Sequence, residues 1–231
     1  MSVKQVVPGV YTIPLGVPNV FLLDSDELTL VDTGYMNSTD KILEAIQAIG
    51  RKSDDLRHIL VTHCHPDHAG SLAELKKKTG ASAYMHPIDA AITRTGKVAS
   101  HLKPSPGLFN NILFRTLIGF NSTEYDAAEV EHEVVDGDNL PIAGGIQAIH
   151  VPGHCAGHLA FLWGKSGGVL FAGDTASNMM GLAYSLGYAD FGEGKRSLTK
   201  LAAFDFEVAC FGHGKEIAQG ASAKFRQKWG A

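Results

Sequence analysis

His-Cys-His-Pro-Asp-His, residues 63–68, is the stretch that decides the fold and the chemistry expected of this chain. Four of its six side chains can bind a metal ion, and imidazole beside carboxylate suits zinc, iron and similar ions. In an extended segment alternate side chains point the same way, so His63 and His65 can face one ion together. Asp67 and His68 follow where the chain must turn, and they can reach a second ion nearby. The spacing therefore predicts a metal site rather than a polar loop with chance histidines.

The elements around this motif place it at the end of a strand. A strand-like run (HILVT, 58–62) precedes it, and a helix-like run (SLAELKKKTG, 71–80) follows it. Pro66 disfavours helix for the residue before it and is predicted to keep the ligands on a loop. Hydrophobic runs also precede three further candidate ligands, which are His154, Asp174 and His213. Ends of adjacent strands at one edge of a sheet form a converging site, because loops carry the side chains and the sheet holds them still.

Five short motifs follow one another along the chain: VDTG (31–34), HCHPDH (63–68), PGHCAGH (152–158), GDT (173–175) and GHG (212–214). In these motifs and their order the chain resembles the metallo-β-lactamase superfamily over nearly its whole length. The resemblance implies an α/β fold, the αββα four-layer sandwich, with the site along one edge. A chain of 231 residues is long enough for one sizeable core. We therefore expect one domain, residues 1–231, with a helical insertion near 88–126.

The resemblance also divides the candidate ligands between two ions. It implies that His63, His65 and His154 hold the first ion, that Asp67, His68 and His213 hold the second, and that Asp174 bridges them. Two ions some 3.5–4 Å apart repel each other, so they need a bridging anion, here Asp174 together with hydroxide. The implied cofactors are two divalent metal ions, with zinc expected first and iron or manganese as alternatives. Asp67 is also the candidate catalytic residue, as a proton shuttle that assists the leaving group.

Two further residues are expected to orient the ligands, and two cysteines to stay out of the site. By resemblance, Asp32 of VDTG is a buried carboxylate that orients the metal-binding loop, a role that would tune the histidines. His158 is the best candidate for such a role among the other histidines. Cys64 and Cys155 each neighbour a proposed ligand, so in extended chain they should point away from the ion. We expect both to be small buried residues.

Strands and helices are expected to alternate along the chain. The strands are expected at 10–13, 19–23, 27–32, 56–62, 82–87, 134–140, 145–151, 158–163, 167–174 and 206–212. The helices are expected at 39–49, 71–80, 197–204, where Ser197 is the expected cap, and 216–229, which Gly220 weakens. The stretch from about 88 to 126 breaks the alternation. Within it, residues 107–120 have amphipathic spacing and predict either a helix packed on the core or a wall over the metals.

Composition limits the other function classes. Hydrophobic residues make up 45% and charged residues 19% of the chain, as in a folded domain. The net charge of −4 gives no basic footprint, so no nucleic acid is expected as a partner. No apolar run approaches the roughly 20 residues that cross a bilayer, so no membrane partner is expected either. The first residues lack the apolar core of a secretory signal, which predicts a cytoplasmic location.

The resemblance indicates a metal-dependent hydrolase that acts on a small ester, lactone, thioester or related acyl substrate through a metal-bridging hydroxide. HCHPDH together with Asp174 is similar to the glyoxalase II and lactonase branches, whereas true β-lactamases commonly have a cysteine ligand at the second ion. Only 18 residues follow His213, too few for the helical domain with which glyoxalase II grips glutathione. Tyr184 lies later than the tyrosine that follows the bridging Asp in lactonases. A mononuclear iron persulfide dioxygenase is the alternative, and a nucleic-acid-processing hydrolase is a third.

Overall fold

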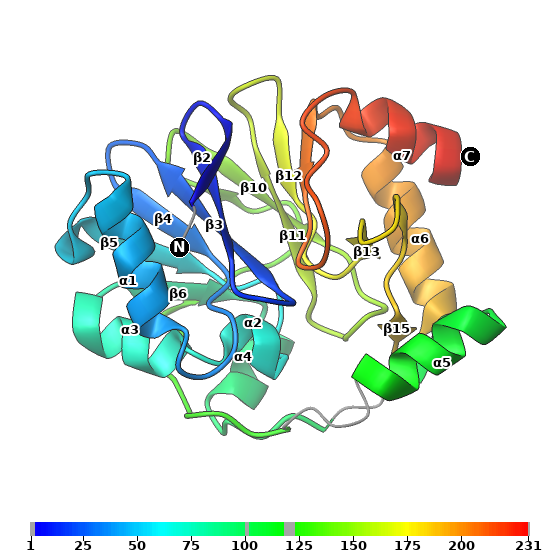
Figure 1. The fold of residues 1–231 in the computed structure, drawn as a ribbon, viewed down its shortest axis with the longest axis horizontal. Helices are drawn as coiled ribbons and strands as arrows, with labels where there is room; N and C mark the ends of the chain where they lie inside the picture. Colours follow the sequence, from blue (N-terminus) through cyan, green and yellow to red (C-terminus); the bar gives the residue numbers. More distant parts are fainter. Residues whose placement is uncertain (1–2, 100–101, 118–122, 231) are drawn as a thin grey trace.

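A computed structural model describes residues 3–99, 102–117 and 123–230, and it contains two main β-sheets with helices outside them (Figure 1). The first sheet has seven strands in the order β1-β2-β3-β4-β5-β6-β8. These strands are β1 (Lys4–Val7), β2 (Val10–Pro14), β3 (Asn19–Asp24), β4 (Leu28–Val31), β5 (Leu56–Leu60), β6 (Ser82–Met85) and β8 (His132–Glu133). β1 to β4 pair antiparallel, whereas β4, β5, β6 and β8 pair parallel.

The second sheet has five strands in the order β16-β12-β11-β10-β9. They are β9 (Asn139–Leu140), β10 (Ile146–His150), β11 (Leu159–Trp163), β12 (Val169–Phe171) and β16 (Val208–Cys210). Two short ribbons lie apart from this sheet, one of β13 (Ala176–Ser177) and β14 (Ala183–Tyr184), the other of β7 (Lys103–Pro104) and β15 (Gly187–Tyr188).

Helices cover the outer face of each sheet (Figure 1). Beside the first sheet lie α1 (Thr39–Ala48), α2 (Pro66–Ala69), α3 (Leu72–Thr79) and α4 (Pro87–Thr93), together with the 3-10 turn η1 (Ser53–Asp55). Beside the second sheet lie α6 (Phe191–Ala202) and α7 (Ala221–Trp229), while α5 (Leu108–Leu117) lies below them at the edge of the molecule. None of the helices in the described ranges is long and apolar enough to cross a bilayer.

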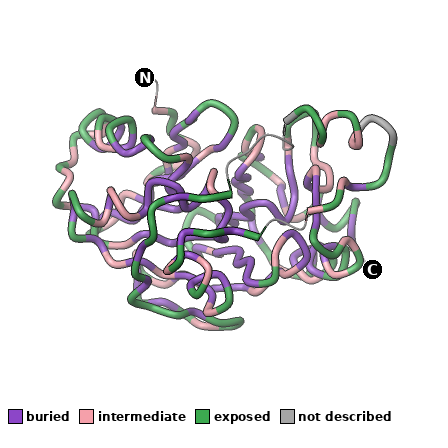
Figure 2. The backbone as a smooth tube through the Cα atoms, turned by 90° about the horizontal axis from the view of Figure 1, so that it is seen from below, coloured by how far each residue is buried: buried purple, intermediate pink, exposed green. Residues whose placement is uncertain are grey.

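Alternation along the strands explains the four layers, because successive side chains of a strand point to opposite faces. Leu22, Leu30 and Ile59 pack with helices α1 and α3 in one apolar cluster. Their neighbours Phe21, Val31 and Leu60 pack against the second sheet in another cluster. In the second sheet, Ala148 and Phe171 join this middle cluster, whereas Ile149 and Leu170 pack against α6 and α7. Three apolar interfaces between four layers confirm the predicted αββα sandwich, whose buried segments lie along the strands (Figure 2).

Three of the predicted elements differ most from the structure. No single strand spans 134–140, because β8 ends at Glu133, β9 begins at Asn139, and a turn with Gly137 at φ 85° separates them. α6 begins at Phe191 rather than Ser197, and Asp190 caps it by accepting a hydrogen bond from the Glu193 amide at 2.9 Å. The prediction at 216–229 is also too long, since α7 begins at Ala221 and Gly220 precedes it with φ 62°.

Tertiary packing explains why α6 extends further than its glycines suggest. Gly192 and Gly194 lower helix propensity in its first two turns. A Cβ atom at Gly194 would lie 2.4 Å from Cε1 of Tyr188, and one at Gly153 would lie 2.3 Å from the Gly194 amide nitrogen. Glycine is therefore needed where the helix approaches both Tyr188 and the turn that contains Gly153, and these contacts outweigh local propensity.

The segment from 88 to 126 carries two helices in its described part, α4 and α5. α4 was not anticipated, and His86 caps its start by accepting a hydrogen bond from the Ile88 amide at 3.3 Å. α5 covers 108–117 of the amphipathic stretch predicted at 107–120, and residues 118–120 lie outside the described ranges.

Candidate metal centre

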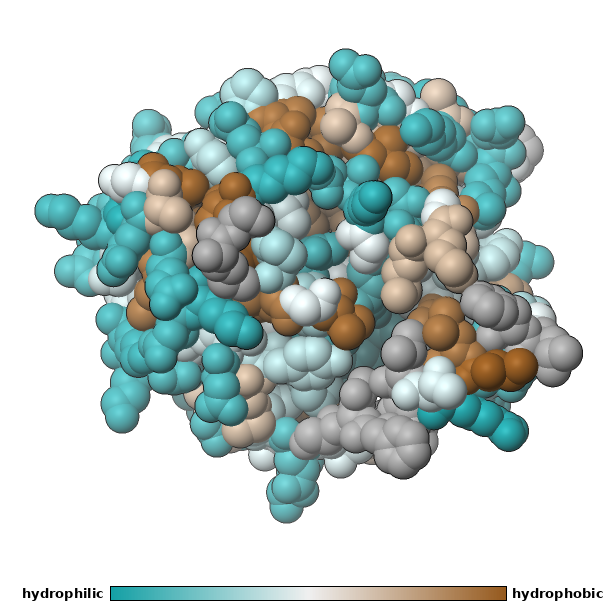
Figure 3. Space-filling model, viewed as in Figure 1, coloured by the Kyte–Doolittle hydropathy of each residue, from teal (hydrophilic) through white to brown (hydrophobic). Residues whose placement is uncertain are grey.

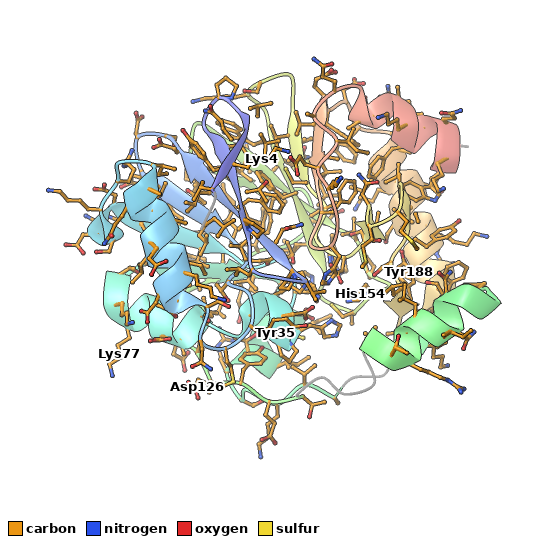
Figure 4. All side chains as sticks on the ribbon, viewed as in Figure 1. Lys4, Tyr35, Lys77, Asp126, His154 and Tyr188 are labelled. Atoms are coloured by element: carbon orange, nitrogen blue, oxygen red, sulfur yellow. The ribbon has the colours of Figure 1, made fainter. Side chains whose placement is uncertain are left out.

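All seven predicted ligands follow the ends of parallel strands. β4 and β5 run parallel in the first sheet, as do β12 and β16 in the second, and β10 has the direction of β12 because both pair antiparallel with β11. The motif at 63–68 follows β5, and His154, Asp174 and His213 follow β10, β12 and β16. Figure 4 shows His154 where the ends of the two sheets meet, beside Tyr188 and above α5. The parallel arrangement thus delivers residues from both halves to one edge.

The motif itself differs in one respect from the prediction. Pro66 begins a one-turn helix, α2, instead of keeping the whole motif on a loop, because its fixed φ suits the first position of a helix. His63 and His65 come from extended chain before α2, whereas Asp67 and His68 are carried on its single turn. The two pairs therefore have different backbone supports.

The side chains form three overlapping groups in which the possible ligand atoms lie within 4.8 Å of one another. These groups are His63, His65 and His154; His63, His68 and Asp174; and Asp67, His68 and His213. The first and last are the two triads expected for two ions, and the middle group joins them. Nε2 of His154 lies 2.9 Å from Nδ1 of His65, so these are the two atoms that face each other across the first triad.

Asp174 lies between the two triads. Its Oδ1 is 3.4 Å from Nε2 of His68, and its Oδ2 is 3.2 Å from Nε2 of His213 and 3.6 Å from Nε2 of His154. Asp67 stands on the side of the second triad, with Oδ2 3.3 Å from Nε2 of His213. A carboxylate in the position of Asp174 reaches atoms of both triads.

Unpartnered polar atoms test whether metal ions fit these groups. Nε2 of His63, Nε2 of His68 and Oδ1 of Asp174 are buried and have no hydrogen-bond partner among the described residues. A buried polar group without a partner is costly. Since all three atoms belong to the groups above and nitrogen and oxygen donors suit zinc, the residues present fit metal ions.

The first triad is arranged to be uncharged in the metal-free protein. Burial lowers the pKa of His65 to about 3, with a further contribution from His154. Burial also lowers the pKa of His63, assisted by His68 and His65, and that of His154. Neutral imidazole is the form that binds a metal, so these three side chains are available for binding at neutral pH.

The second triad has the opposite electrostatics because it faces carboxylates. Burial alone would lower the pKa of His68, but Asp67, Asp174 and Asp32 outweigh it and raise that pKa to about 9. Burial likewise opposes protonation of His213, and Asp174 and Asp67 raise its pKa well above the ordinary value. For Asp67 and Asp174 burial would raise the pKa, but the neighbouring His68 and His213 lower it. In the metal-free protein, the second triad is thus a network of charged pairs.

Asp32 contacts the motif as expected from VDTG. Its Oδ2 lies 2.8 Å from Nδ1 of His68, and its Oδ1 accepts a hydrogen bond from the Thr62 amide at 2.7 Å. Asp32 is buried and has φ 62°, a conformation that is uncommon for a residue other than glycine. The contact directs Nε2 of His68 toward Asp67 and Asp174, the side of the possible ligands.

His158 also lies where a supporting residue is expected. It is fully buried, its Nε2 accepts a hydrogen bond from the Asp174 amide at 2.9 Å, and its ring stacks on that of His63 at 4.7 Å. Because the backbone of Asp174 and the ring of His63 are both held by His158, this residue supports two of the grouped side chains. Burial lowers the pKa of His158 well below its ordinary value.

Several supporting contacts were not anticipated from the sequence. Nδ1 of His154 lies 2.8 Å from the carbonyl oxygen of Gly187, and Nδ1 of His63 lies 3.0 Å from Oγ1 of Thr62. Asp89 of α4 accepts hydrogen bonds from the backbone beside both histidine loops. Of these supporting residues, only Thr62 could have been suspected from the sequence, because it directly precedes the motif. Gly187 and Asp89 are far from their partners in sequence.

The cysteines and Tyr184 lie outside the three groups. Cys64 is buried in the apolar cluster beneath the first sheet, as expected. Cys155 is partly exposed rather than fully buried, and its Sγ donates to Oδ2 of Asp89 at 3.2 Å. Tyr184 packs against Phe191 and Trp229, with ring centroids 5.0 and 5.9 Å away, in the α6–α7 layer.

Comparison with solved structures agrees with this fold. The structure is similar to a metallo-β-lactamase of Cronobacter sakazakii with a HARLDQ motif, with a TM-score of 0.73 and 21% identity over 92% of this chain and 78% of that one. It is also similar to a subclass B3 metallo-β-lactamase of Bradyrhizobium japonicum, with a TM-score of 0.73 and 21% identity over 99% of this chain and 90% of the other. At this identity the likeness establishes the fold alone.

Sequence comparison gives relatives of related description. A "Lactamase-like protein" of Emericella nidulans is 25% identical over 81% of this chain and 48% of its own length. A "Probable metallo-hydrolase" of Bacillus subtilis is 25% identical over 86% of this chain and 67% of its own length. A "Hydroxyacylglutathione hydrolase" of Methylococcus capsulatus is 27% identical over 74% of this chain and 51% of its own length. The chain spans between about half and two thirds of the length of these relatives.

The model of one protein family matches residues 13–213, which include all seven clustered side chains. That family is described as the metallo-beta-lactamase superfamily. The match covers most of the chain, and it agrees with the four-layer fold and with the strand-end position of the histidines and carboxylates. This chain therefore belongs to the metallo-beta-lactamase superfamily.

Proposed function

We propose that this chain is a metal-dependent hydrolase that holds two divalent ions, zinc in the first instance. His63, His65 and His154 would hold the first ion, Asp67, His68 and His213 the second, and Asp174 would contact both. The observation that carries the proposal is the pair of triads joined by Asp174, in which three buried atoms that can bind a metal have no hydrogen-bond partner among the described residues.

The chain's own residues have separable roles in this reaction. When bound, the ions would supply a water molecule that ionises near neutral pH and would polarise the acyl carbonyl. Asp32, His158 and the Gly187 carbonyl orient the ligand histidines and Asp174 by the contacts described above. Asp67, whose side chain is 15% exposed, is placed to accept a proton from the attacking water and return it to the leaving group.

The substrate class we propose is a small ester, lactone or thioester with an apolar acyl group. Val17 and Met179 are exposed apolar residues near the loop that carries His213: the Val17 carbonyl lies 3.3 Å from Nδ1 of His213, and the Met179 amide lies close to Gly214. Apolar patches also lie on this face between the β2–β3 hairpin and α5 (Figure 3). An acyl chain can bury such surface on binding. Hydroxyacylglutathione hydrolases among the relatives support an acyl substrate over a persulfide.

We further propose that residues 1–231 form one domain of this fold and that α5 is a wall of its substrate pocket. Phe114 of α5 packs on Gly187, where an added Cβ would lie 2.5 Å from the ring. The Gly187 carbonyl in turn contacts His154. These contacts support a role for α5 beside the first triad.

Metal analysis and a substrate screen test the proposal together. Elemental analysis of the purified chain is expected to give two ions per chain after supplementation with zinc or manganese. The zinc-loaded protein is expected to hydrolyse at least one ester, lactone or thioester without consuming oxygen. One ion that does not increase on supplementation would contradict the dinuclear site. Oxygen uptake with glutathione persulfide, seen with iron and absent with zinc, would overturn hydrolysis in favour of dioxygenation.

A further inference from the structure

Asp89 is a buried carboxyl group whose contacts are not explained by the folding of its own helix. It lies in the first turn of α4 and is fully inaccessible to solvent. Among the described residues it takes part in no ion pair, although burying a carboxyl group is costly unless it is well hydrogen-bonded. Its partners therefore indicate why an acid occupies this position.

The two oxygens of Asp89 bind two different loops. Oδ2 accepts a hydrogen bond from the Cys64 amide at 2.9 Å and from Sγ of Cys155 at 3.2 Å, while Oδ1 accepts one from the Gly157 amide at 2.9 Å. Cys64 stands between His63 and His65, and Cys155 directly follows His154. Asp89 therefore joins the loop that carries two members of the first triad to the loop that carries the third.

Close packing leaves this connection little freedom. A Cβ atom at Gly157 would lie 2.2 Å from Oδ1 of Asp89 and 2.9 Å from its amide nitrogen. The second loop is also held from outside by His150, whose Nε2 lies 2.8 Å from the Ala156 carbonyl and whose ring stacks on His86, the cap of α4, at 4.3 Å. The start of α4 is thus a common support for both loops.

The second triad has different supports. His68 is held by Asp32, and His213 follows β16 in the second sheet, where its Nδ1 faces Val17. The hydrogen bonds of Asp89 go to neither His68 nor His213. The hydrogen bonds of Asp89 therefore go to the loops of the first triad, and a change at Asp89 acts most directly on that triad.

We propose that Asp89 is a positioning residue that sets the distance between the His63–His65 loop and the His154 loop, and so sets the affinity of the first metal site relative to the second. The affinity part rests on the proposed function. Residues that orient metal ligands typically contribute 10–100-fold to metal affinity. The effect should be larger at the first site than at the second site of the same chain.

Asp89→Asn tests this with little change in shape, because the amide has one accepting oxygen where the carboxylate has two. One of the two loops then faces an NH₂ group instead of an acceptor. Cys155→Ala removes one hydrogen bond and keeps the two backbone ones. Thr93→Val is the matched control: Thr93 is buried in the same helix, and its Oγ1 lies 3.0 Å from the Tyr125 hydroxyl and contacts neither loop.

Hydrogen exchange of the metal-free protein measures the connection itself. Asp89→Asn is expected to speed exchange of the Cys64 and Gly157 amides by about tenfold or more relative to the rest of the chain. Cys155→Ala should speed exchange of the same two amides by a smaller factor. Thr93→Val should change the exchange rates of these two amides only as much as those of other amides. A uniform increase throughout the chain in Asp89→Asn, or no increase, would overturn the connection.

Chelator competition with zinc measures the consequence. In Asp89→Asn the first-site dissociation constant is expected to rise about 10–100-fold while the second changes less than about threefold. Visible spectra of the cobalt-substituted protein should identify which site is altered. Equal weakening of zinc binding at both sites would overturn the proposal, because general destabilisation would have this effect. Thr93→Val measures how much general destabilisation of α4 contributes. A wild-type chain that binds no metal would refute the proposed function and the affinity claim, while the exchange rates would still decide whether Asp89 joins the loops.

Discussion

His68 and His213 differ from the other clustered histidines because nearby carboxylates outweigh burial and raise their pKa. In the metal-free protein His68 is protonated at neutral pH, since its pKa is raised to about 9, whereas the pKa of His65 is lowered to about 3. A metal ion binds the neutral ring, so binding at the second triad must first remove a proton. The charged network that keeps the metal-free site ordered therefore competes with the metal.

The first prediction follows from this competition. Zinc affinity of the second site should rise as the pH increases toward about 9, because the proton on His68 is lost in that range. First-site affinity should be nearly constant from pH 6 to 9, because His65 and His63 are already neutral there. Calorimetric titration in two buffers of different ionisation enthalpy should show proton release mainly in the binding step that fills the second site. Equal proton release in both steps would contradict this assignment.

A second prediction concerns Asp67. Removing its carboxylate by Asp67→Ala should deplete the second ion and lower turnover by about 10²–10⁴-fold, because both a ligand and a proton acceptor are lost. The fold should persist, since Asp67 lies outside the three apolar clusters. Elemental analysis, initial rates and the far-ultraviolet circular dichroism spectrum measure these quantities. Asp54→Ala, at an exposed position, is the control, and near-normal metal and activity in Asp67→Ala would refute both roles.

Gly212 gives a third prediction at this scale. An added Cβ there would lie 2.4 Å from Oδ1 of Asp174 and 2.5 Å from Cε1 of His68. Gly212→Ala should therefore displace Asp174 and His68 and lower metal content. Gly164→Ala is the matched control, because a Cβ at Gly164 meets nothing within 4 Å. Metal content of Gly212→Ala equal to that of Gly164→Ala would show that the site has more room than these distances allow.

Among the elements, α5 is distinguished by its position at the edge of the molecule, where Phe114 reaches the Gly187 backbone (Figure 1). The other outer helices pack on a sheet through one of the three apolar clusters, whereas none of the α5 residues whose side chains the structure describes belongs to them. Such an element can vary without loss of the sandwich, and so it is suited to shape the pocket.

The fourth prediction is that Phe114→Ala changes substrate preference more than metal content. Removing the ring opens the space beside Gly187, so the ratio of kcat/KM between large and small acyl substrates should rise. Ile112→Ala is the control, because Ile112 is exposed on the same helix. An equal loss of activity on all substrates, in step with a lowered melting temperature, would instead assign Phe114 a packing role. The side chain of Phe109, another candidate for this role, lies outside the described part.

At the scale of the whole molecule, the site joins the two halves of the sandwich. Four clustered side chains follow β5 of the first sheet, and three follow strands of the second. Ligands that bind only the folded chain stabilise it, by about 2.7 kcal/mol at a concentration of 100 times Kd. Metal binding should therefore oppose separation of the sheets as well as support catalysis.

A fifth prediction tests this coupling. Saturating zinc should raise the melting temperature of the chelator-treated protein by roughly 5–10 °C, given about 2–4 °C per kcal/mol for a chain of this size. Calorimetry or circular dichroism at several zinc concentrations gives the shift. Asp67→Ala keeps the first triad, so zinc should still raise its melting temperature, by a smaller amount. No shift in the unmodified chain would mean that metal binding and folding are independent.

The sequence by itself determined the fold class and the membership of the cluster. Runs of apolar and β-branched residues between turn residues predicted most of the strands, because these preferences are read from the local sequence. HCHPDH and the three later residues were predicted as one group, and the structure brings all seven together. The start of α6 was wrong by six residues, since Gly192 and Gly194 lower local helix propensity while contacts with Tyr188 and Gly153 stabilise the helix.

Only the tertiary structure decided how the site is supported. Asp89 is 25 residues from Cys64 and 68 from Gly157, and no local pattern marks it as their partner. Gly187 reaches His154 through its backbone carbonyl, a group that every residue type carries and that composition cannot distinguish. His65 and His68 are three residues apart, yet burial and His154 lower the pKa of His65, whereas Asp67, Asp174 and Asp32 raise that of His68. Of these neighbours only Asp67 belongs to the same motif. Motifs reveal which atoms can bind a metal. The protonation and the orientation of these side chains are decided by the tertiary structure, because both depend largely on neighbours supplied by other elements.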